Sequence, residues 1–324
     1  SRWAHEPRSL VTARALFDRL HRMEDLVPFV ELADGLPTPV EEIDDRLWVM
    51  RDDLTSSRYG GNKVRKFEFV LPVAQRRGGP VITAGGIGSH HVLAAAIWGR
   101  QLGLEVEAVL FPQPVTDDVR HTQAELRQVG ARVTLTPHRY LMPMTLGQRL
   151  AALAPRKPYL LWPGASTPLG TLGYVSAGLE LVASGIPEPD SVVVSLGSGG
   201  TCVGLALGLV LGGWRKAKVV AARAADVTVT NMAVLGSMEA ATAALLALGG
   251  WRPVPARLKI DTGWLGPGYG HPTEAGEAAT RAAAGYGLAV EPTYTAKAFA
   301  CALDRHNDGQ RVVFVQTFAG PGSP

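Results

Sequence analysis

The chain has 324 residues, of which 46% are hydrophobic, so it is long enough for a large core and about two domains. Its formal net charge is +3, and it has no dense basic run that would suggest a nucleic-acid partner. No stretch approaches ~18 uninterrupted apolar residues, so no transmembrane helix is expected. The two cysteines, Cys202 and Cys301, lie far apart and residues 1–6 lack a signal-peptide pattern, so we expect no disulfide framework, no metal site and a reduced, cytoplasmic, soluble protein.

Short apolar runs in the first half of the chain lead into glycine-rich or polar turns and then into segments with helical period. The pattern predicts strands at 47–50, 80–83, 106–111 and 132–135. It predicts helices at about 89–102 and 117–129. Strands that alternate with helices indicate parallel sheets in an α/β fold.

A second series of the same kind follows. It predicts strands at 159–162, 192–196, 218–222 and 311–315. Helices are expected at about 169–183 and in the alanine-rich segment 226–248. The proline and glycine cluster near residues 155–170 is interpreted as a crossing between two domains.

One lysine stands in a run of loop-forming residues, Gly60-Gly61-Asn62-Lys63, and is followed closely by Arg65 and Lys66. Neighbouring cations and burial push a lysine amine toward its neutral, nucleophilic form, which is what forming a Schiff base requires. The alternative is a turn that leads into a helix with a basic face. The run by itself does not decide between the two.

The run Gly197-Ser198-Gly199-Gly200-Thr201 follows the apolar strand at 192–196 and opens a helix that begins near Cys202. Backbone N–H groups and the helix dipole form an anion site there, to which Ser198 and Thr201 can add hydroxyl donors. Because Cys202 occupies the place of the third glycine, the run does not fit a dinucleotide-binding loop, and it lacks the lysine of a P-loop. We therefore expect a single phosphate, the alternative being a turn without a ligand.

The second strand-to-helix loop is Gly85-Gly86-Ile87-Gly88-Ser89-His90-His91. Ser89 is a natural N-cap, and free N–H groups at this helix start can bind a carboxylate. Adjacent histidines diverge on a helix and no third ligand is nearby in sequence, so a metal is not expected. A polar pocket lining is favoured over a surface cap.

Three hydroxyl side chains near the end of the chain also attract attention. Tyr269 lies among glycines in the segment 266–270, and Tyr294 stands at the expected start of a helix. A tyrosine near a helix N-terminus or a cation can become a proton donor or a nucleophile, although each alone is more often a packed aromatic. Thr317 follows the strand at 311–315, at the strand end where open α/β sheets bind ligands.

Together these motifs resemble the pyridoxal-phosphate enzymes of fold type II, the tryptophan synthase β-like fold, and among them the D-cysteine desulfhydrase and 1-aminocyclopropane-1-carboxylate deaminase family. The similarity runs from about Leu36 to Phe318. The segments that carry it are 51–53, 60–68, 85–87, 168–170, 173–174, 197–201 and 294–297. The resemblance implies a large cofactor-binding domain from residues 1–62 and 163–324, a small domain from 63–162, and a homodimer.

The resemblance also implies roles for the site residues. Lys63 would hold pyridoxal 5′-phosphate through a Schiff base and then act as the base on the substrate Cα. Residues 197–201, helped by Lys66, would hold the phosphate, and Asn62 would shape the loop before the lysine. Thr317 would face the pyridine nitrogen, and a neutral hydroxyl partner makes the ring a weaker electron sink than a carboxylate partner does.

On the substrate side, Ser89 and the N–H groups after it would hold the carboxylate, and Tyr269 and Tyr294 would move protons or attack. Thr295 stands where the deaminase branch has a glutamate, which favours removal of a β-substituent over opening of a cyclopropane. We therefore expect a lyase that acts on a small amino acid such as D-cysteine and releases a keto acid, ammonia and sulfide. The alternatives are a deaminase of the cyclopropane substrate, a pyridoxal-phosphate enzyme for a different amino acid, and a relative without catalysis.

The chain departs from the family pattern where the substrate is expected. His90 replaces an asparagine that meets the cofactor's 3′-oxygen, next to His91, and Gly88 replaces a glutamine. Phe318 and Ala319 replace two glycines, so the phenyl ring would crowd the far side of the cofactor. These departures put the substrate in question more than the cofactor.

Overall fold

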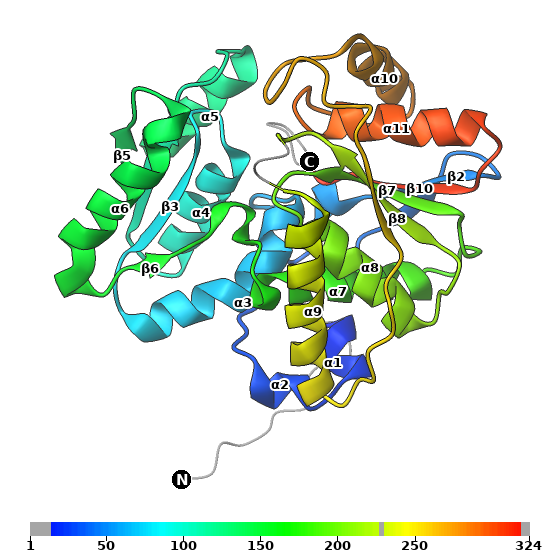
Figure 1. Ribbon diagram of the computed structural model, residues 1–324, viewed down its shortest axis with the longest axis horizontal. Helices are drawn as coiled ribbons and strands as arrows, with labels where there is room; N and C mark the ends of the chain where they lie inside the picture. The colour runs from blue at the N-terminus through cyan, green and yellow to red at the C-terminus, as the bar shows by residue number, and fades with distance from the viewer. Residues whose placement is uncertain (1–13, 227–229, 319–324) are drawn as a thin grey trace.

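The computed structural model describes residues 14–226 and 230–318. They form two α/β units that lie side by side, one built on a six-stranded sheet and the other on a four-stranded sheet (Figure 1). The expected α/β fold with parallel sheets flanked by helices is confirmed. Ala319, and part of the alanine-rich segment predicted to be helical from 226, lie outside the described residues.

The larger sheet has the strand order β1-β2-β10-β7-β8-β9, and only the β1–β2 pair is antiparallel. Its strands are β1 (Val40–Glu42), β2 (Leu47–Met50), β7 (Ser191–Leu196), β8 (Lys218–Arg223), β9 (Leu258–Asp261) and β10 (Val312–Val315). The central strands are almost continuous runs of buried aliphatic residues, because helices cover both faces of the sheet. The edge strands β1 and β9 are partly exposed and lack such runs, which is why the sequence patterns did not predict them.

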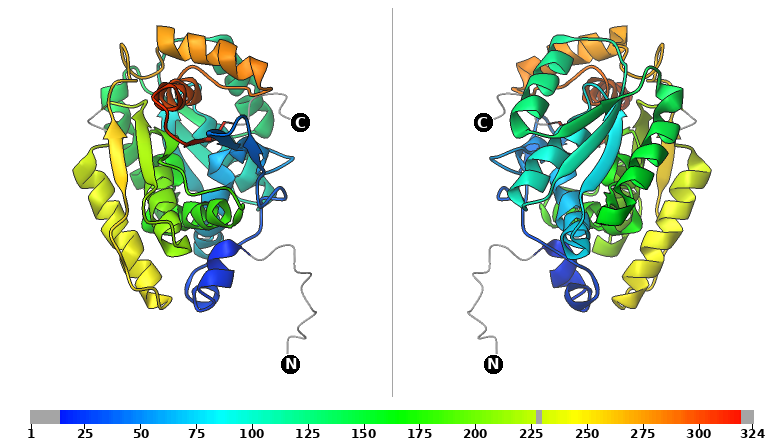
Figure 2. Two further views of the ribbon diagram at one scale, coloured as in Figure 1. Left: turned by 90° about the vertical axis from the view of Figure 1, so that its right-hand side faces the viewer. Right: turned by 90° about the vertical axis from the view of Figure 1, so that its left-hand side faces the viewer.

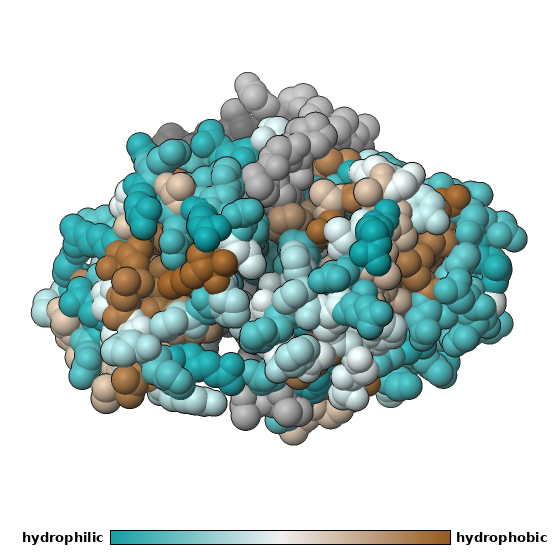
Figure 3. Space-filling view, turned by 90° about the horizontal axis from the view of Figure 1, so that it is seen from above, coloured by the Kyte–Doolittle hydropathy of each residue, from teal (hydrophilic) through white to brown (hydrophobic). Residues whose placement is uncertain are grey.

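The smaller sheet is entirely parallel, in the order β5-β4-β3-β6. Its strands are β3 (Val81–Gly86), β4 (Val106–Phe111), β5 (Arg132–Leu135) and β6 (Tyr159–Leu160). The helices that flank it are α4 (His90–Gln101), α5 (Asp117–Val129) and α6 (Met142–Leu153). Seen from above, apolar side chains gather on part of this half's surface (Figure 3). Exposed apolar residues of this half include Leu135, Leu141 and Met144.

The remaining helices belong mostly to the larger half. They are α1 (Ala15–Arg19), α2 (Met23–Leu26), α3 (Asn62–Arg77), α7 (Pro168–Ala183), α8 (Gly200–Gly212), α9 (Met232–Leu248), α10 (Glu274–Gly285) and α11 (Thr295–Asn307). Short 3-10 turns are η1 (Asp52–Leu54), η2 (Arg139–Leu141), η3 (Ala154–Arg156) and η4 (Pro163–Ala165). The side views place α1 and α2 at the end of the molecule opposite α10 and α11, with α9 along one flank (Figure 2).

Helix α3 connects the two halves, since it packs on α7 of the larger half and on α4 of the smaller half. A buried ionic network holds it: Arg65 pairs with Asp52, which follows β2, and with Glu180 of α7, each at 2.8 Å. We propose that the two sheets mark the two expected domains, residues 1–62 with 163–324 and residues 63–162, with α3 at their boundary. Among the described residues, no helix has the length and apolar composition that crossing a membrane requires.

Most predicted elements lie where the patterns placed them. The strands at 47–50, 106–111 and 132–135 and the helix at 117–129 have the predicted bounds. The strand predicted at 159–162 ends at Leu160, because the chain turns into the exposed Trp162 and then Pro163. Short or weakly patterned elements, such as α1, α2, α6 and α10, were not predicted.

Candidate active site

A cavity of about 440 Å³ lies between the two halves, at the carboxyl ends of strands from both sheets. Parallel strands direct their carboxyl-end loops to the same edge of a sheet, where ligands bind in such folds. Of the site residues expected from sequence, all except Gly200 line this cavity. They are Asn62, Lys63, Lys66, Ser89, His90, His91, Gly197, Ser198, Gly199, Thr201, Tyr269, Tyr294, Thr295, Thr317 and Phe318.

Lys63 is the second residue of α3 and points its amine into the cavity, where Nζ donates to Asn62 Oδ1 at 2.5 Å. The preceding Gly61 has φ 82°, a left-handed conformation that favours glycine, and this lets the loop turn into the helix. Burial lowers the pKa of Lys63 to about 8, although the charge of Glu291 acts in the opposite direction. A substantial fraction of the amine is therefore neutral, and nucleophilic, slightly above neutral pH.

Asn62 links three segments around this lysine. Its backbone N–H donates to the carbonyl of Thr317, just after β10, at 3.1 Å. Its side-chain amide donates to the Thr201 hydroxyl at 3.3 Å. These bonds tie the lysine loop to the end of β10 and to the glycine loop.

The glycine loop between β7 and α8 forms a cradle with no room for side chains. Gly199 has φ 94°, which requires glycine. A Cβ on Gly200 would lie 2.8 Å from Ser166 Oγ and 3.2 Å from Lys66 Nζ. Ser166, which the motifs did not identify, accepts from the Gly200 N–H at 3.1 Å and bonds the Ser198 hydroxyl at 2.7 Å. Backbone N–H groups and two hydroxyls thus converge at the start of α8, as an anion site needs.

Lys66 is the basic side chain of this cradle. Its Nζ donates to the Gly164 carbonyl at 3.1 Å and lies over the Tyr174 ring, 5.8 Å from the centroid. Burial, together with the charge of Lys63, lowers the pKa of Lys66 well below its usual value. Within the described part of the chain no carboxylate pairs with this amine. A buried amine without an anionic partner, at the start of a helix, fits a phosphate, whose negative charge would favour the protonated amine.

Ser89 caps α4, as predicted, and its Oγ accepts from the Val92 N–H at 3.4 Å. The backbone before it is tightly enclosed: a Cβ on Gly85 would lie 2.6 Å from Ser89 Oγ, and one on Gly86 would collide with the Gln113 side chain. Gln113, which follows β4, was not expected at the site. The N-terminus of α4 thus presents a serine hydroxyl and backbone donors to the cavity, an arrangement that fits a carboxylate.

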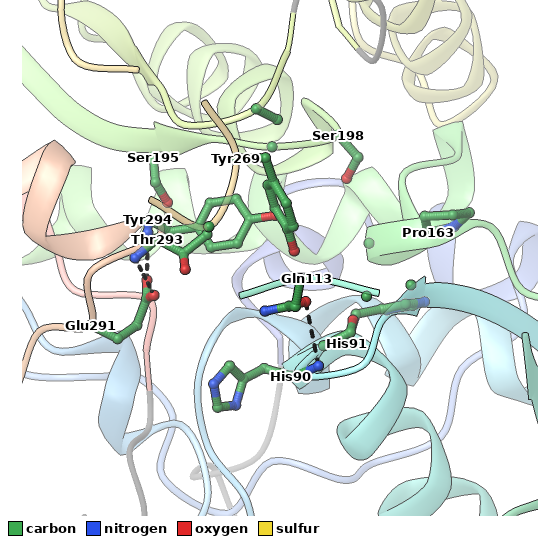
Figure 4. A pocket seen from close by; sticks show the side chains of 18 of the residues that line it. His90, His91, Gln113, Pro163, Ser195, Ser198, Tyr269, Glu291, Thr293 and Tyr294 are labelled. Carbon is green, nitrogen blue, oxygen red and sulfur yellow. Dashed lines mark hydrogen bonds between the residues drawn. The ribbon is translucent and has the colours of Figure 1, made fainter. Parts of the chain in front are cut away.

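His90 and His91 have different surroundings (Figure 4). His90 uses both ring nitrogens: Nδ1 lies 2.9 Å from the Tyr59 hydroxyl, and Nε2 lies 3.0 Å from Asp118 Oδ2. It would therefore reach a cofactor oxygen only by giving up one of these bonds. His91 Nε2 lies 2.9 Å from the Thr83 hydroxyl, and burial together with the charges of nearby lysines lowers the pKa of His91 well below its usual value.

Tyr269 and Tyr294 meet edge to face across the cavity from His90, with ring centroids 5.9 Å apart (Figure 4). Burial raises the pKa of both tyrosines, that of Tyr294 especially, so both are neutral phenols at neutral pH and can donate protons. Tyr294 is the N-cap residue of α11, as expected. A Cβ on Gly197 would lie 3.1 Å from its ring, so the glycine loop and the tyrosine pack directly together.

The Glu291 carboxylate fixes the start of α11. It accepts from the backbone N–H groups of Thr293, Tyr294 and Thr295 at 2.7, 2.7 and 2.8 Å. The Thr295 hydroxyl accepts in turn from the Glu291 N–H at 2.9 Å. Sequence reasoning missed this role, because the usual capping glutamate lies three residues after the N-cap, whereas Glu291 lies three residues before it.

Phe318 lies against His90, edge to face, with ring centroids 4.9 Å apart. Thr317, just before it, is buried at the end of β10 and lines the cavity.

The described part of the chain holds no group of three His, Cys, Asp or Glu side chains arranged to bind a metal ion.

Comparison with known proteins identifies the family. Residues 32–317 match the model of the pyridoxal-phosphate dependent enzymes. The chain belongs to this family. Its cofactor is therefore pyridoxal 5′-phosphate, and the buried Lys66 and the glycine cradle described above fit the phosphate of that group.

Individual relatives narrow the family. The chain is 34% identical over 328 residues to the D-cysteine desulfhydrase of Klebsiella pneumoniae (strain 342), covering 91% of this chain and 94% of the relative. It is 33% identical over 330 residues to the D-cysteine desulfhydrase of Salmonella typhi, with the same coverage. A solved structure of an ACC deaminase homologue matches with a TM-score of 0.79 and 26% identity over 95% of both chains.

A more distant solved structure, the threonine deaminase isoform 2 of Solanum lycopersicum, matches with a TM-score of 0.65 at 15% identity, over 95% of this chain and 90% of that chain. This likeness concerns the fold alone. The expected fold type II and the expected relation to the desulfhydrase and deaminase family are both confirmed.

Proposed function

We propose that the protein is a pyridoxal-phosphate dependent lyase that removes a β-substituent from a small amino acid, with D-cysteine as the first candidate. The products would be a keto acid and ammonia, with sulfide from cysteine. The observation that carries the proposal is the Lys63 amine, which lines the same cavity as an anion cradle and a pair of neutral tyrosines. The similarity to D-cysteine desulfhydrases over 91% of the chain supports this choice.

When bound, the cofactor supplies an electron sink that stabilises negative charge at the substrate Cα. Lys66, Ser198 and the N–H groups of the glycine loop would hold its phosphate, and Lys63 would bind its aldehyde carbon. Thr317 would face the ring nitrogen with a hydroxyl. The neutral Lys63 amine, once released, would take the Cα proton, because burial makes it a base that works near neutral pH.

The substrate would be held by its carboxylate at the start of α4, through Ser89 and the backbone donors there. Tyr269 and Tyr294 would carry protons on the opposite side of the cavity. Thr295 offers no carboxylate beside this pair, and Glu291 uses both of its oxygens to cap α11. This favours loss of a β-substituent over opening of a cyclopropane ring, which leaves cyclopropane deamination as the less favoured activity.

An absorbance screen of D- and L-amino acids tests the proposal. Purified protein loaded with pyridoxal phosphate should show a yellow chromophore that shifts with D-cysteine, and pyruvate and sulfide should appear. Lys63→Ala should lose both the chromophore and the turnover. If the chromophore persists in Lys63→Ala, the lysine is not the attachment point, and if no amino acid shifts the wild-type chromophore, the protein is a binding relative without catalysis.

One observation favours a second candidate, a lyase for an amino acid other than cysteine. The His90 and Phe318 rings pack together at the cavity wall, where the family pattern has smaller residues. In the same screen, a chromophore shift with other amino acids but not with D-cysteine would select this candidate.

We also propose that the enzyme is a homodimer, as its family suggests, which sedimentation analysis of the holoenzyme would test.

A further inference from the structure

Three side chains on the four-stranded-sheet side of the cavity form an unbroken hydrogen-bonded chain. Tyr59 comes from the loop before α3, His90 from the first turn of α4 and Asp118 from the first turn of α5. The Tyr59 hydroxyl lies 2.9 Å from His90 Nδ1, and His90 Nε2 lies 3.0 Å from Asp118 Oδ2. All three residues line the cavity, and the proposed function gives none of them a part in proton transfer.

The chemistry of the partners decides where the protons lie. A carboxylate can only accept, so His90 Nε2 carries a hydrogen and donates it to Asp118. The bond between Tyr59 and Nδ1 can then have either direction. In the neutral imidazole Nδ1 accepts the phenol hydrogen, whereas in the imidazolium Nδ1 donates and the phenol hydrogen is free to point elsewhere.

Asp118 and Tyr59 suit this exchange. Asp118 stabilises the imidazolium as the carboxylate of a catalytic triad does, by holding the ring and balancing its charge. Burial raises the pKa of Tyr59, so that its hydroxyl remains a neutral donor rather than a phenolate. Phe318 packs edge to face on the His90 ring and holds it in place between its two partners.

We propose that Tyr59, His90 and Asp118 form a proton relay that protonates the departing group of the substrate. Tyr59 gives its hydroxyl proton to the leaving atom as the bond from that atom to the substrate Cβ breaks and its electron pair leaves with it. His90 Nδ1 passes its own proton to the Tyr59 oxygen, so the imidazolium becomes neutral and one proton has moved from His90 to the leaving group. This inference rests on the proposed elimination. Tyr59 is its catalytic residue, and His90 and Asp118 are positioning residues.

The relay narrows the class of substrate. A thiol has a pKa of about 8.5, so a thiolate departs without much help, whereas an oxygen or nitrogen leaving group is far more basic and needs a proton as it leaves. A dedicated donor beyond the tyrosine pair is therefore most useful for an amino acid whose β-substituent leaves through oxygen or nitrogen. A substrate of this class, different from cysteine, is in line with His90 and Phe318, the two residues that depart from the family pattern at the cavity wall.

A leaving-group series tests the relay. β-Chloroalanine, cysteine and serine, in the enantiomer that the enzyme accepts, would be turned over by wild type, Tyr59→Phe, Asp118→Asn and the double variant. We expect both single variants to lose about 10²-fold on serine, less on cysteine and nothing on β-chloroalanine, because chloride needs no proton. Since the residues act in one chain, the double variant should lose no more than the worse single variant. An equal loss on all three substrates, or losses that multiply, would overturn the proposal.

A measurement without cofactor or substrate tests the hydrogen bonds themselves. Nitrogen-15 NMR of the cofactor-free protein should show His90 with its hydrogen on Nε2, and Tyr59→Phe should move the Nδ1 resonance. His306 and Asp44 provide the matched control, since they form a second histidine–aspartate pair, at 2.9 Å, away from the cavity. Asp44→Asn should move the His306 resonances and leave all three turnovers unchanged.

The two failures can be told apart. A wild-type protein that turns over none of the three substrates overturns the proposed elimination and with it the leaving-group role. A wild type that is active, with His90 resonances that do not respond to Tyr59→Phe, overturns the relay alone.

Discussion

Two lysines one helical turn apart on α3, Lys63 half-buried and Lys66 buried, suit different tasks because their neighbours differ. Lys63 faces the cavity beside an amide oxygen, which suits an amine that must react. Lys66 faces a carbonyl and a glycine loop, which suits an amine that would pair with a bound phosphate. In both cases burial lowers the pKa, but in the proposed roles only Lys66 would meet a ligand's negative charge, which would offset the cost of a buried ammonium.

The first residue-scale prediction concerns pH. Because the pKa of Lys63 is lowered to about 8, the amine is largely protonated below that pH and neutral above it. The rate at which cofactor-free protein captures pyridoxal phosphate should therefore rise with pH and level off about one unit above this value. Stopped-flow absorbance measures this rate, and Lys63→Ala is the control that should capture none. A rate that keeps rising toward pH 10.4, the range of an ordinary lysine, would contradict the lowered pKa.

The second residue-scale prediction concerns phosphate. Inorganic phosphate should stabilise the cofactor-free wild type against thermal unfolding, by about 2.7 kcal/mol at a concentration 100 times its Kd. Lys66→Ala should lose most of this effect because the cradle loses its buried charge. The exposed Lys218, at the start of β8, provides the control, and Lys218→Ala should respond like the wild type. Equal stabilisation of Lys66→Ala and wild type would place the anion elsewhere.

Among the elements, α7 and α8 approach unusually closely because glycines line their contact. A Cβ on Gly208 would collide with the Val175 carbonyl, and the Cα of Gly178 lies 2.9 Å from the same position. Helix α8 starts at the glycine loop, so this packing positions the phosphate cradle. The sequence shows these glycines, but without the partner helix they resemble residues that merely weaken a helix.

The element-scale prediction compares two helical glycines. Gly208→Ala should destabilise the protein by about 1–3 kcal/mol, because the methyl group has no room between α7 and α8. Gly147→Ala in α6, where no atom lies within 4 Å of the added Cβ, should stabilise it by about 0.5–1 kcal/mol through helix propensity. Urea unfolding measures both. Similar effects at the two sites would argue against a close α7–α8 contact.

In the whole molecule, Lys63 sits on the helix that connects the two halves, and a buried network anchors that helix. Arg65 pairs with Asp52 and Glu180, and the Tyr174 hydroxyl donates to Asp52 at 2.6 Å. The same Tyr174 ring lies under Lys66. The network therefore positions both lysines of the site relative to the larger sheet.

The whole-molecule prediction follows from the cost of weakening a buried ionic network. Asp52→Asn should lower the free energy of unfolding by about 1.5–3 kcal/mol and weaken cofactor binding, because Arg65 keeps Glu180 but loses its second carboxylate partner and α3 is less firmly held. Urea unfolding and an absorbance titration measure the two effects. Glu105→Gln breaks an exposed ion pair with Arg156 and should change neither. An Asp52→Asn protein as stable as the wild type would show that packing alone holds α3.

Local sequence patterns predicted many of the strands and helices of the fold. Buried strands are continuous apolar runs, and the turns that end them need glycine, so the central strands and both glycine loops were predictable from neighbouring residues. Local patterns did not predict the partly exposed strands β1 and β9 or the short helices α1 and α2, because nothing in their composition separates them from loops. Their structure depends on the strands and helices beside them.

The sequence by itself determined where the candidate lysine, the glycine loops and the tyrosines lie, since each depends on residue type and on the turn that carries it. Through the family that these motifs resemble, it also determined the cofactor. Only the tertiary structure decided what these groups touch. Ser166, Asp118 and Tyr59 reach the site from segments that local patterns do not connect, and their bonds span 28 to 34 residues. A hydrogen bond depends on distances of a few tenths of an ångström, and those distances are set by the packing of two sheets around α3, which no local pattern encodes.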